Sequence, residues 1–106
     1  MEFIETVKFA ACLYEYLDDD SYLDLQLLLI AQPDRGDLIK GGGGIRKLRF
    51  AMHGKGKSGG IRIIYYWVSE QGQIYLLHLY PKSKKENLTD AEVAELRQLA
   101  KEINHG

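Results

Sequence analysis

The stretch "RKLRFAMHGKGKSGGIRIIYY", residues 46–66, decides the fold because it contains a strand pattern on each side of a glycine-rich segment. Its first five residues alternate, with Leu48 and Phe50 on one parity and Lys47 and Arg49 on the other. This period of two predicts a strand with one buried face and one cationic face. The segment "GKGKSGG" holds too many glycines for a regular element and predicts a loop.

Two runs of β-branched and aromatic residues follow, "IRIIYYWV" at 61–68 and "QIYLLHLY" at 73–80. The turn sequence "SEQG" between them predicts a β-hairpin. These two runs therefore add two antiparallel strands to the strand that contains Lys47 and Arg49.

The register of this hairpin determines which side chains share a face, because a shift of one residue reverses every side chain. We expect an odd number of loop residues, 70–72. Arg62 then shares a sheet face with three residues at the end of the second strand: His78, Tyr80 and Lys82. An even loop would place Leu79 on that face instead.

Two helices are predicted before this sheet. From Thr6, apolar residues recur every three or four positions as far as Leu17, which indicates an amphipathic helix. The "DDDS" that follows offers an N-cap at one of its last three residues, 19–21, for a second helix over roughly residues 22–31. That helix is apolar nearly all round, so we expect it either to be buried on all sides or to be covered by a partner.

Together these elements predict a single α+β domain over residues 1–106, in which a helical hairpin packs on one face of a small twisted antiparallel sheet of three or four strands. The fourth strand would come from residues 2–5, and Thr89 and Glu92 form the capping box of a C-terminal helix. The opposite sheet face is expected to stay open and to carry three cations: Lys47, Arg49 and Arg62.

Charge is distributed unevenly along the chain, although the formal net charge is only −1 and the pI is about 6.3. Residues 1–37 hold nine acids and two bases, residues 38–69 hold seven bases and no acid, and residues 70–106 hold six acids and five bases. A strip of cations suits a polyanion, because its summed field attracts phosphates. The simplest alternative is a solvated face, since edge strands often carry Lys to prevent aggregation. That alternative explains poorly why residues 38–69 contain no acid, because solvated faces normally mix positive and negative charges.

Several classes of protein do not fit the sequence. The chain starts with an acid after Met1 and has no basic n-region, so no signal peptide is expected, and its longest apolar run is too short to span a bilayer. The single cysteine, Cys12, excludes an internal disulfide and fits a reducing compartment. We therefore expect a cytoplasmic protein.

Phosphate-loop and metal chemistry also fit poorly. The "GKS" at 56–58 leads into a strand rather than a helix, and Ala51 stands where a P-loop requires glycine. The histidines lack a cysteine pair or paired carboxylates at metal-ligand spacing, so no zinc site is expected. Cys12 lies on the apolar stripe of a helix, which favours a small buried hydrophobe over a nucleophile.

A cluster of Lys and Arg is chemically sufficient for RNA cleavage without a metal. The reaction needs a group that takes the 2′-OH proton, cations that stabilise the phosphorane, and a proton donor for the leaving oxygen. Arginine forms two parallel hydrogen bonds with phosphate, and a lysine among other cations can act as a base because its charged form is disfavoured. A protein that only binds RNA would carry the same residues.

Two blocks, "GGIRKLRFAMHGKGKSGGIRIIYYW" and "IYLLHLYPKSKKENLTDAEVAELRQL", together with the order of helices and strands, resemble the RelE/HigB family of toxins from toxin–antitoxin pairs. The likeness is greatest to the HigB-type branch and covers roughly residues 36–104. It implies a RelE-like fold and a ribosome-dependent endoribonuclease that cuts messenger RNA in the decoding site, with no metal and no cofactor. It also implies a cognate antitoxin, commonly a helix-turn-helix repressor.

The resemblance further implies roles for individual residues. Arg62 in "GGIRIIYY" matches the family arginine that stabilises the transition state. Lys47 and Arg49 match the basic strand residues that hold the scissile phosphate, one of them acting as base, and Lys82 matches a basic residue after the last strand. Six more residues are expected to contact RNA: Arg46, Lys55, Lys57, His78, Tyr80 and Lys84.

The chain departs from the family pattern in two places. Ser83 and Thr89 stand where several members place an arginine and a tyrosine, so Tyr80 or His78 becomes the candidate for stacking and proton donation. Two other functions fit the same sequence. One is a non-enzymatic RNA-binding module that uses the cationic face. The other is a ParE-like toxin that acts on DNA gyrase, for which the Lys/Arg cluster would be dispensable.

Overall fold

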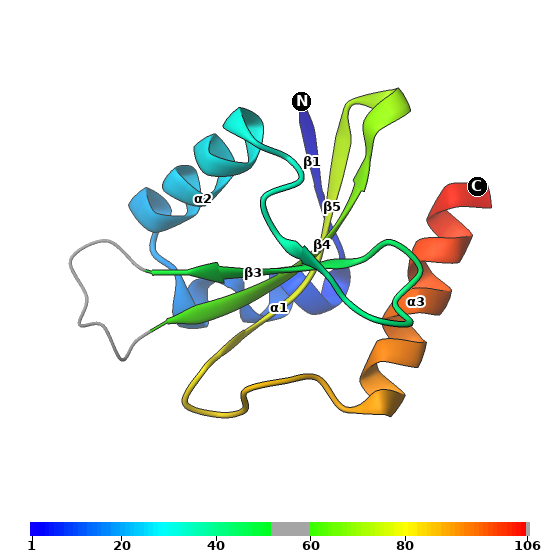
Figure 1. The fold of residues 1–106 in the computed structure, drawn as a ribbon. Helices are drawn as coiled ribbons and strands as arrows, with labels where there is room; N and C mark the ends of the chain where they lie inside the picture. The colour runs from blue at the N-terminus through cyan, green and yellow to red at the C-terminus, as the bar shows by residue number, and fades with distance from the viewer. Residues whose placement is uncertain (52–59, 106) are drawn as a thin grey trace.

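The computed structural model describes residues 1–51 and 60–105. In these residues three α-helices pack against a mixed five-stranded sheet with the strand order β1-β5-β4-β3-β2 (Figure 1). The strands are β1 (Glu2–Glu5), β2 (Asp37–Leu38), β3 (Arg46–Phe50), β4 (Ile61–Val68) and β5 (Gln73–Pro81). The helices are α1 (Val7–Tyr16), α2 (Asp19–Ala31) and α3 (Asp90–His105), and a 3-10 turn, Ser69–Gln71, connects β4 to β5.

The α+β class and the order of elements are confirmed, whereas the sheet is larger than expected and is not purely antiparallel. The strand at residues 2–5 exists, but β1 pairs parallel to β5, from Glu2 opposite Gln73 to Glu5 opposite Leu76. Such a parallel pair is possible because β1 is not joined to β5 by a tight turn: the connection passes through α1, α2 and three other strands. The two-residue β2 extends the other edge, and its short sequence "DL" carried no strand pattern.

The helical hairpin covers one face of the sheet. Apolar side chains of α1 and α2, among them Phe9, Leu13 and Leu25, pack with inward-facing residues of β3, β4 and β5. The alternation expected for the first basic strand is confirmed, since Leu48 and Phe50 belong to this core.

The opposite face was expected to stay open, and over much of its area this expectation is wrong. The apolar stripe of α3, with Leu96 and Ala100, packs there on Ile64 of β4 and Leu77 of β5. Figure 1 shows α2 and α3 on opposite sides of the strands. Because β4 and β5 are covered on both sides, their near-continuous apolar runs are the pattern expected of doubly buried strands.

Local hydrogen bonds set where each helix begins. The Thr6 hydroxyl accepts a bond from the N–H of Phe9 and starts α1. The N-cap of α2 is Asp18, whose carboxylate accepts from the N–H of Ser21 at 2.8 Å, so the expected caps at 19–21 are wrong by at least one residue. The capping box of α3 is confirmed, with both reciprocal bonds between Thr89 and Glu92 present.

The second helix is buried on one side only. Tyr22, Leu25 and Leu29 face the core, whereas Leu23 and Leu27 are each 53% exposed. Of the two expectations for this apolar helix, complete burial within the chain is therefore wrong. None of the helices in the described residues is long and apolar enough to cross a membrane.

The hydroxyl of Tyr65 anchors the segment between α2 and β2. It accepts a hydrogen bond from the N–H of Gly36 at 2.8 Å and donates one to the carbonyl of Pro33 at 2.7 Å. A Cβ at Gly36 would lie 2.8 Å from the Tyr65 ring, so the backbone can approach the ring only because residue 36 is glycine. This anchor holds the chain where it enters β2 and then β3.

We predict that Tyr65→Phe lowers the free energy of unfolding by about 1–3 kcal/mol, because the buried N–H of Gly36 and the Pro33 carbonyl lose their partner. Urea unfolding followed by circular dichroism measures the change. Tyr75→Phe is the matched control, since the Tyr75 hydroxyl makes only a 3.5 Å contact with Gln73. Equal stability of the two variants would contradict the anchor.

We also predict that the protein loses stability at acid pH, because interactions of Glu92 at the start of α3 are lost. The pKa of Glu92 is lowered from 4.5 to about 2, because Lys85 donates to its carboxylate and the N–H of Thr89 does so as well. A lowered carboxylate pKa gives a stabilisation that is complete above pH 4.5 and is lost as the pH falls to about 2. Urea midpoints measured across this range should converge for wild type and Glu92→Gln at the acid end. A gap that stays constant would contradict the ion pair as the cause.

Candidate active site on the cationic sheet face

A β-bulge in β5 decides which side chains lie beside Arg62. Residues 69–72 separate β4 from β5, so the expected odd loop of 70–72 is wrong. Ile64 pairs with His78 while Tyr65 pairs with Leu76, which leaves Leu77 as an extra residue. The extra residue compensates for the even loop, and the expected shared face of Arg62 with His78 and Tyr80 is confirmed.

Three cations meet at a cleft of about 260 Å³ at the start of β4. Arg49 lies directly opposite Arg62 across the β3–β4 pair, and Lys82 follows the end of β5. The N–H of Lys82 donates to the carbonyl of Gly60 at 2.9 Å, which holds the two ends of this hairpin together. The full lining is Arg49, Phe50, Ala51, Gly60, Arg62 and Lys82.

Arg62 is the buried member of this set. It is only 5% exposed, and its guanidinium pairs with the Glu86 carboxylate at 3.1 Å. Its Nε has no hydrogen-bond partner in the described part of the chain. The guanidinium lowers the pKa of Glu86, chiefly through their hydrogen bond, so this carboxylate is ionised at neutral pH. Because the Glu86 side chain is 53% exposed, a phosphate can compete with it for the Arg62 guanidinium.

The loop between β5 and α3 brings two residues to this face that the sequence did not indicate. Glu86 pairs with Arg62, and the amide oxygen of Asn87 accepts a hydrogen bond from Lys47 Nζ at 2.8 Å. Lys47 lies opposite Ile64 and therefore on the same face as Arg62. Residues 38–69 contain no acid, but the fold places Glu86 beside Arg62, which belongs to that segment. Only the fold could reveal this contact.

His78 and Tyr80 lie next to Arg62 but are buried. Their rings are 5.6 Å apart, and neither His78 Nδ1 nor the Tyr80 hydroxyl has a hydrogen-bond partner among the described residues. Burial lowers the pKa of His78 to about 4, with Lys8 and Lys85 adding to the effect. The imidazole is therefore neutral at pH 7. Lys85 lies 5.2 Å from the centre of the Tyr80 ring and also pairs with Glu92.

Other residues expected at the site lie elsewhere. Arg46 donates to the backbone carbonyls of Asp34 and Gly36, which gives it a structural role on the loop after α2. Lys84 lies 5.6 Å above the ring of Tyr16 on α1. Lys55 and Lys57, together with the glycine-rich loop that contains them, lie outside the described residues. Among the residues that are described, no three His, Cys, Asp or Glu side chains form a group that could hold a metal ion.

The family model for the RelE toxin of the RelE/RelB toxin–antitoxin system matches residues 23–105, which are 83 of the 106 residues. The match includes β2 to β5 and α3, and with them every residue of the cationic cleft. The chain therefore belongs to the RelE toxin family. It is the toxin component of a toxin–antitoxin system, and its family implies a cognate antitoxin.

We predict that Glu86→Gln strengthens anion binding at the cleft several-fold, because the carboxylate competes with any bound phosphate for Arg62. An NMR titration of the full chain with inorganic phosphate at neutral pH measures the effect. Glu70→Gln is the matched control, since Glu70 is an exposed carboxylate in the turn between β4 and β5. Phosphate affinity that is unchanged or lower in Glu86→Gln would contradict the competition.

Proposed function

We propose that this toxin is a ribosome-dependent endonuclease that blocks translation by cutting messenger RNA. The observation that carries the proposal is the cleft in which Arg49, Arg62 and Lys82 converge. The resemblance of the surrounding motifs to the HigB-type branch adds the ribosome as the setting and a helix-turn-helix protein as the antitoxin. The reaction uses the 2′-OH of the RNA itself as nucleophile, and no metal or cofactor takes part.

Arg62 would stabilise the transition state. Its guanidinium is held by β4 within the fold, so its orientation is fixed before substrate arrives, which is the condition for strong electrostatic stabilisation of developing charge. Two parallel N–H groups can bind two phosphoryl oxygens at once. The incoming phosphate would take the place of the Glu86 carboxylate, which lies on an exposed loop.

Lys47, Arg49 and Lys82 would complete the chemistry. Arg49 lies opposite Arg62 and would hold the scissile phosphate from the other side, while Lys47, one residue pair further along the same face, would accept the 2′-OH proton. The 2′ oxygen then bonds to phosphorus and the bond to the 5′ oxygen breaks. Lys82, exposed at the cleft, would give that oxygen a proton. The products are a 2′,3′-cyclic phosphate and a 5′-hydroxyl end.

The neutral state of His78 favours this assignment over a histidine acid. With its pKa near 4, His78 carries no dissociable imidazolium proton at pH 7. The hydroxyl of Tyr80 is also buried, and burial raises its pKa. Both side chains would instead support Arg62 from the neighbouring strand.

The deciding experiment maps 5′ ends of a reporter message in a reconstituted translation reaction, with ribosomes present or omitted. We expect cuts within codons only when ribosomes and toxin are both present. An intact message with blocked translation would support a non-enzymatic RNA-binding protein instead. An intact message with normal translation would overturn both and favour a gyrase-directed toxin.

We predict that Arg62→Ala lowers the rate of message cleavage roughly 100- to 1,000-fold, the loss typical of removing one preorganised donor to a developing anion. RNA affinity should fall only about 10-fold, as for the removal of one charged hydrogen bond. Arg62→Lys keeps the charge and removes the two-pronged geometry, so we expect it to bind like wild type and to cleave slowly. Circular dichroism checks folding, because Arg62 is buried. Equal losses of binding and cleavage in Arg62→Ala would contradict a catalytic role.

A further inference from the structure

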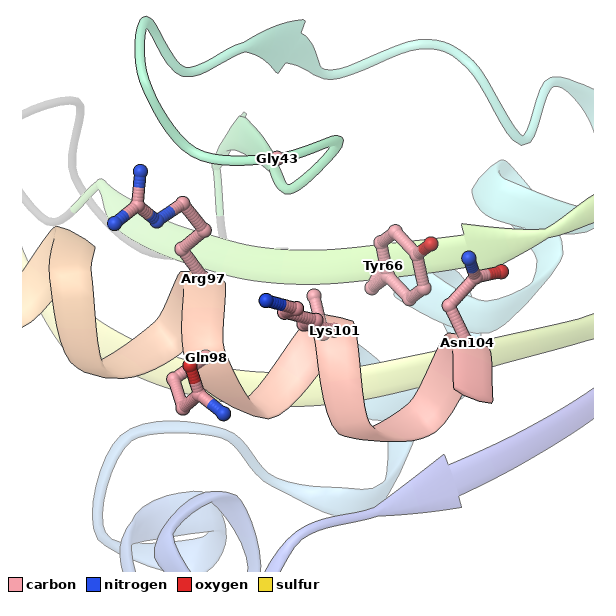
Figure 2. A pocket seen from close by; sticks show the side chains of 7 residues that line it. Gly43, Tyr66, Arg97, Gln98, Lys101 and Asn104 are labelled. Atoms are coloured by element: carbon pink, nitrogen blue, oxygen red, sulfur yellow. The ribbon is translucent and has the colours of Figure 1, made fainter. Parts of the chain in front are cut away.

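A second pocket, distinct from the cationic cleft, lies between α3 and the glycine-rich loop that precedes β3 (Figure 2). Its volume is about 410 Å³, which is in the size range of small-molecule sites. Its lining consists of Gly43, Tyr66, Arg97, Gln98, Ala100, Lys101 and Asn104. None of these residues lines the cleft at Arg62.

The charged residues of this pocket are both cations. Arg97 and Lys101 lie one turn apart on α3, and Figure 2 shows both side chains between the helix and the loop that holds Gly43. Neither forms an ion pair within residues 1–51 and 60–105. The acids Glu95 and Glu102 line a neighbouring hollow, which shares Gln98 with this pocket. In a chain with net charge −1, two cations at one pocket that have no ion-pair partner among the described residues indicate an anionic ligand.

The loop that contains Gly43 and Gly44 passes close to an aromatic ring and a cation of the pocket. A Cβ at Gly44 would lie 2.9 Å from the Tyr66 ring, and one at Gly43 would lie 2.9 Å from Cγ of Arg97. Both glycines also have positive φ, at 104° and 68°, which disfavours any other residue. The run "GGGG" therefore lets the backbone pass close to Tyr66 and Arg97 without filling the space between them.

The pocket continues the cationic face that holds the proposed active site. Tyr66 follows Arg62 by four residues on β4 and lies on the same face, so their Cα atoms are roughly 13 Å apart at about 3.3 Å per residue. Lys47 pairs with Ile64 and therefore lies between the positions of Arg62 and Tyr66 along the strands. Because Leu96 and Ala100 of α3 cover Ile64, an extended anionic strand bound at Arg62 would run along β3, past Lys47, to reach Arg97.

We propose that this pocket is a second subsite for single-stranded RNA, which holds a nucleotide of the message a short distance from the scissile phosphate. A phosphate would bind between Arg97 and Lys101, and the base would stack on the ring of Tyr66. The amides of Gln98 and Asn104 would offer hydrogen bonds to the base edge. The inference rests on the proposed function for the identity of the strand, but the pocket's affinity for RNA can be measured without cleavage.

Fluorescence anisotropy of the full chain with a labelled eight-nucleotide single-stranded RNA tests how the pocket binds phosphate. We expect Arg97→Ala/Lys101→Ala to weaken binding roughly 10-fold or more. The dependence of log K on log[salt] should become shallower by roughly 0.7 for each phosphate that the variant no longer neutralises. The control, Lys8→Ala/Arg35→Ala, removes the same two residue types from α1 and from the loop after α2. Equal weakening in the two double variants would overturn the subsite.

The same assay tests the stacking of a base on Tyr66. Tyr66→Leu should weaken RNA binding roughly 5- to 100-fold, the range for removal of one stacked base, whereas Tyr66→Phe keeps the ring and should bind like wild type. Both variants keep an apolar side chain against the α3 core. Equal binding by Tyr66→Leu and Tyr66→Phe would overturn the stacking role.

Ribosome assays separate this inference from the proposed function. If the message is cut, the Arg97/Lys101 double variant should raise KM with little change in kcat, the opposite of the effect expected for Arg62→Ala. If wild type cuts nothing while oligonucleotide binding still depends on Tyr66, Arg97 and Lys101, the proposed function fails and the subsite stands. A photoreactive uridine beside the cut should crosslink to the Tyr66 segment. Crosslinks from Tyr66 to ribosomal RNA alone would overturn the assignment to the message.

Discussion

The extra residue in β5 is the constraint on which the arrangement of the candidate site depends. With the even loop at 69–72 and no bulge, Arg62 would lie opposite Leu79, and His78 would face the core under α1 and α2. The bulge at Leu77 lets Leu79 enter that core while His78 and Tyr80 face the other side. Burial of Leu79 at 1% exposure thus holds the register that puts Tyr80 beside Arg62.

Covering the sheet on both sides has an electrostatic consequence. Because α3 and the loop before it cover the face that carries Arg62, the guanidinium is removed from water and requires an anionic partner. Glu86 supplies it from a loop, and the Glu86 side chain is 53% exposed, so the partner is exchangeable whereas the arginine is fixed. A fixed cation with a replaceable anion is suited to a substrate phosphate that must bind and then leave.

The sequence predicted the features that depend on local patterns. Alternation indicated the strand with Lys47 and Arg49, and the T-x-x-E spacing indicated the start of α3. The bulge could not be predicted, because "QIYLLHLY" is apolar on both parities and fits either register. Nor could the Arg62–Glu86 pair, since it joins residues 24 positions apart through a loop without a repeating pattern. The packing of α3 on the face that carries Arg62 was not predicted, because the apolar stripe of this helix was not assigned to either face of the sheet.

The uneven distribution of charge explains how a chain of net charge −1 can act on a polyanion. Of the nine acids in residues 1–37, four lie on α1 and α2, which pack on one face, whereas the cleft and the α3 pocket lie on the other. At physiological ionic strength the field of a charge decays over about 8 Å, so an RNA strand on the cationic face responds to nearby cations far more than to acids across the sheet. The four acids of α3 lie on the same side of the sheet as the cleft, so the cations attract RNA through their local field and not through a separation of charge between the two faces. Net charge therefore describes this toxin poorly, and the local field on each face of the sheet determines what that face can bind.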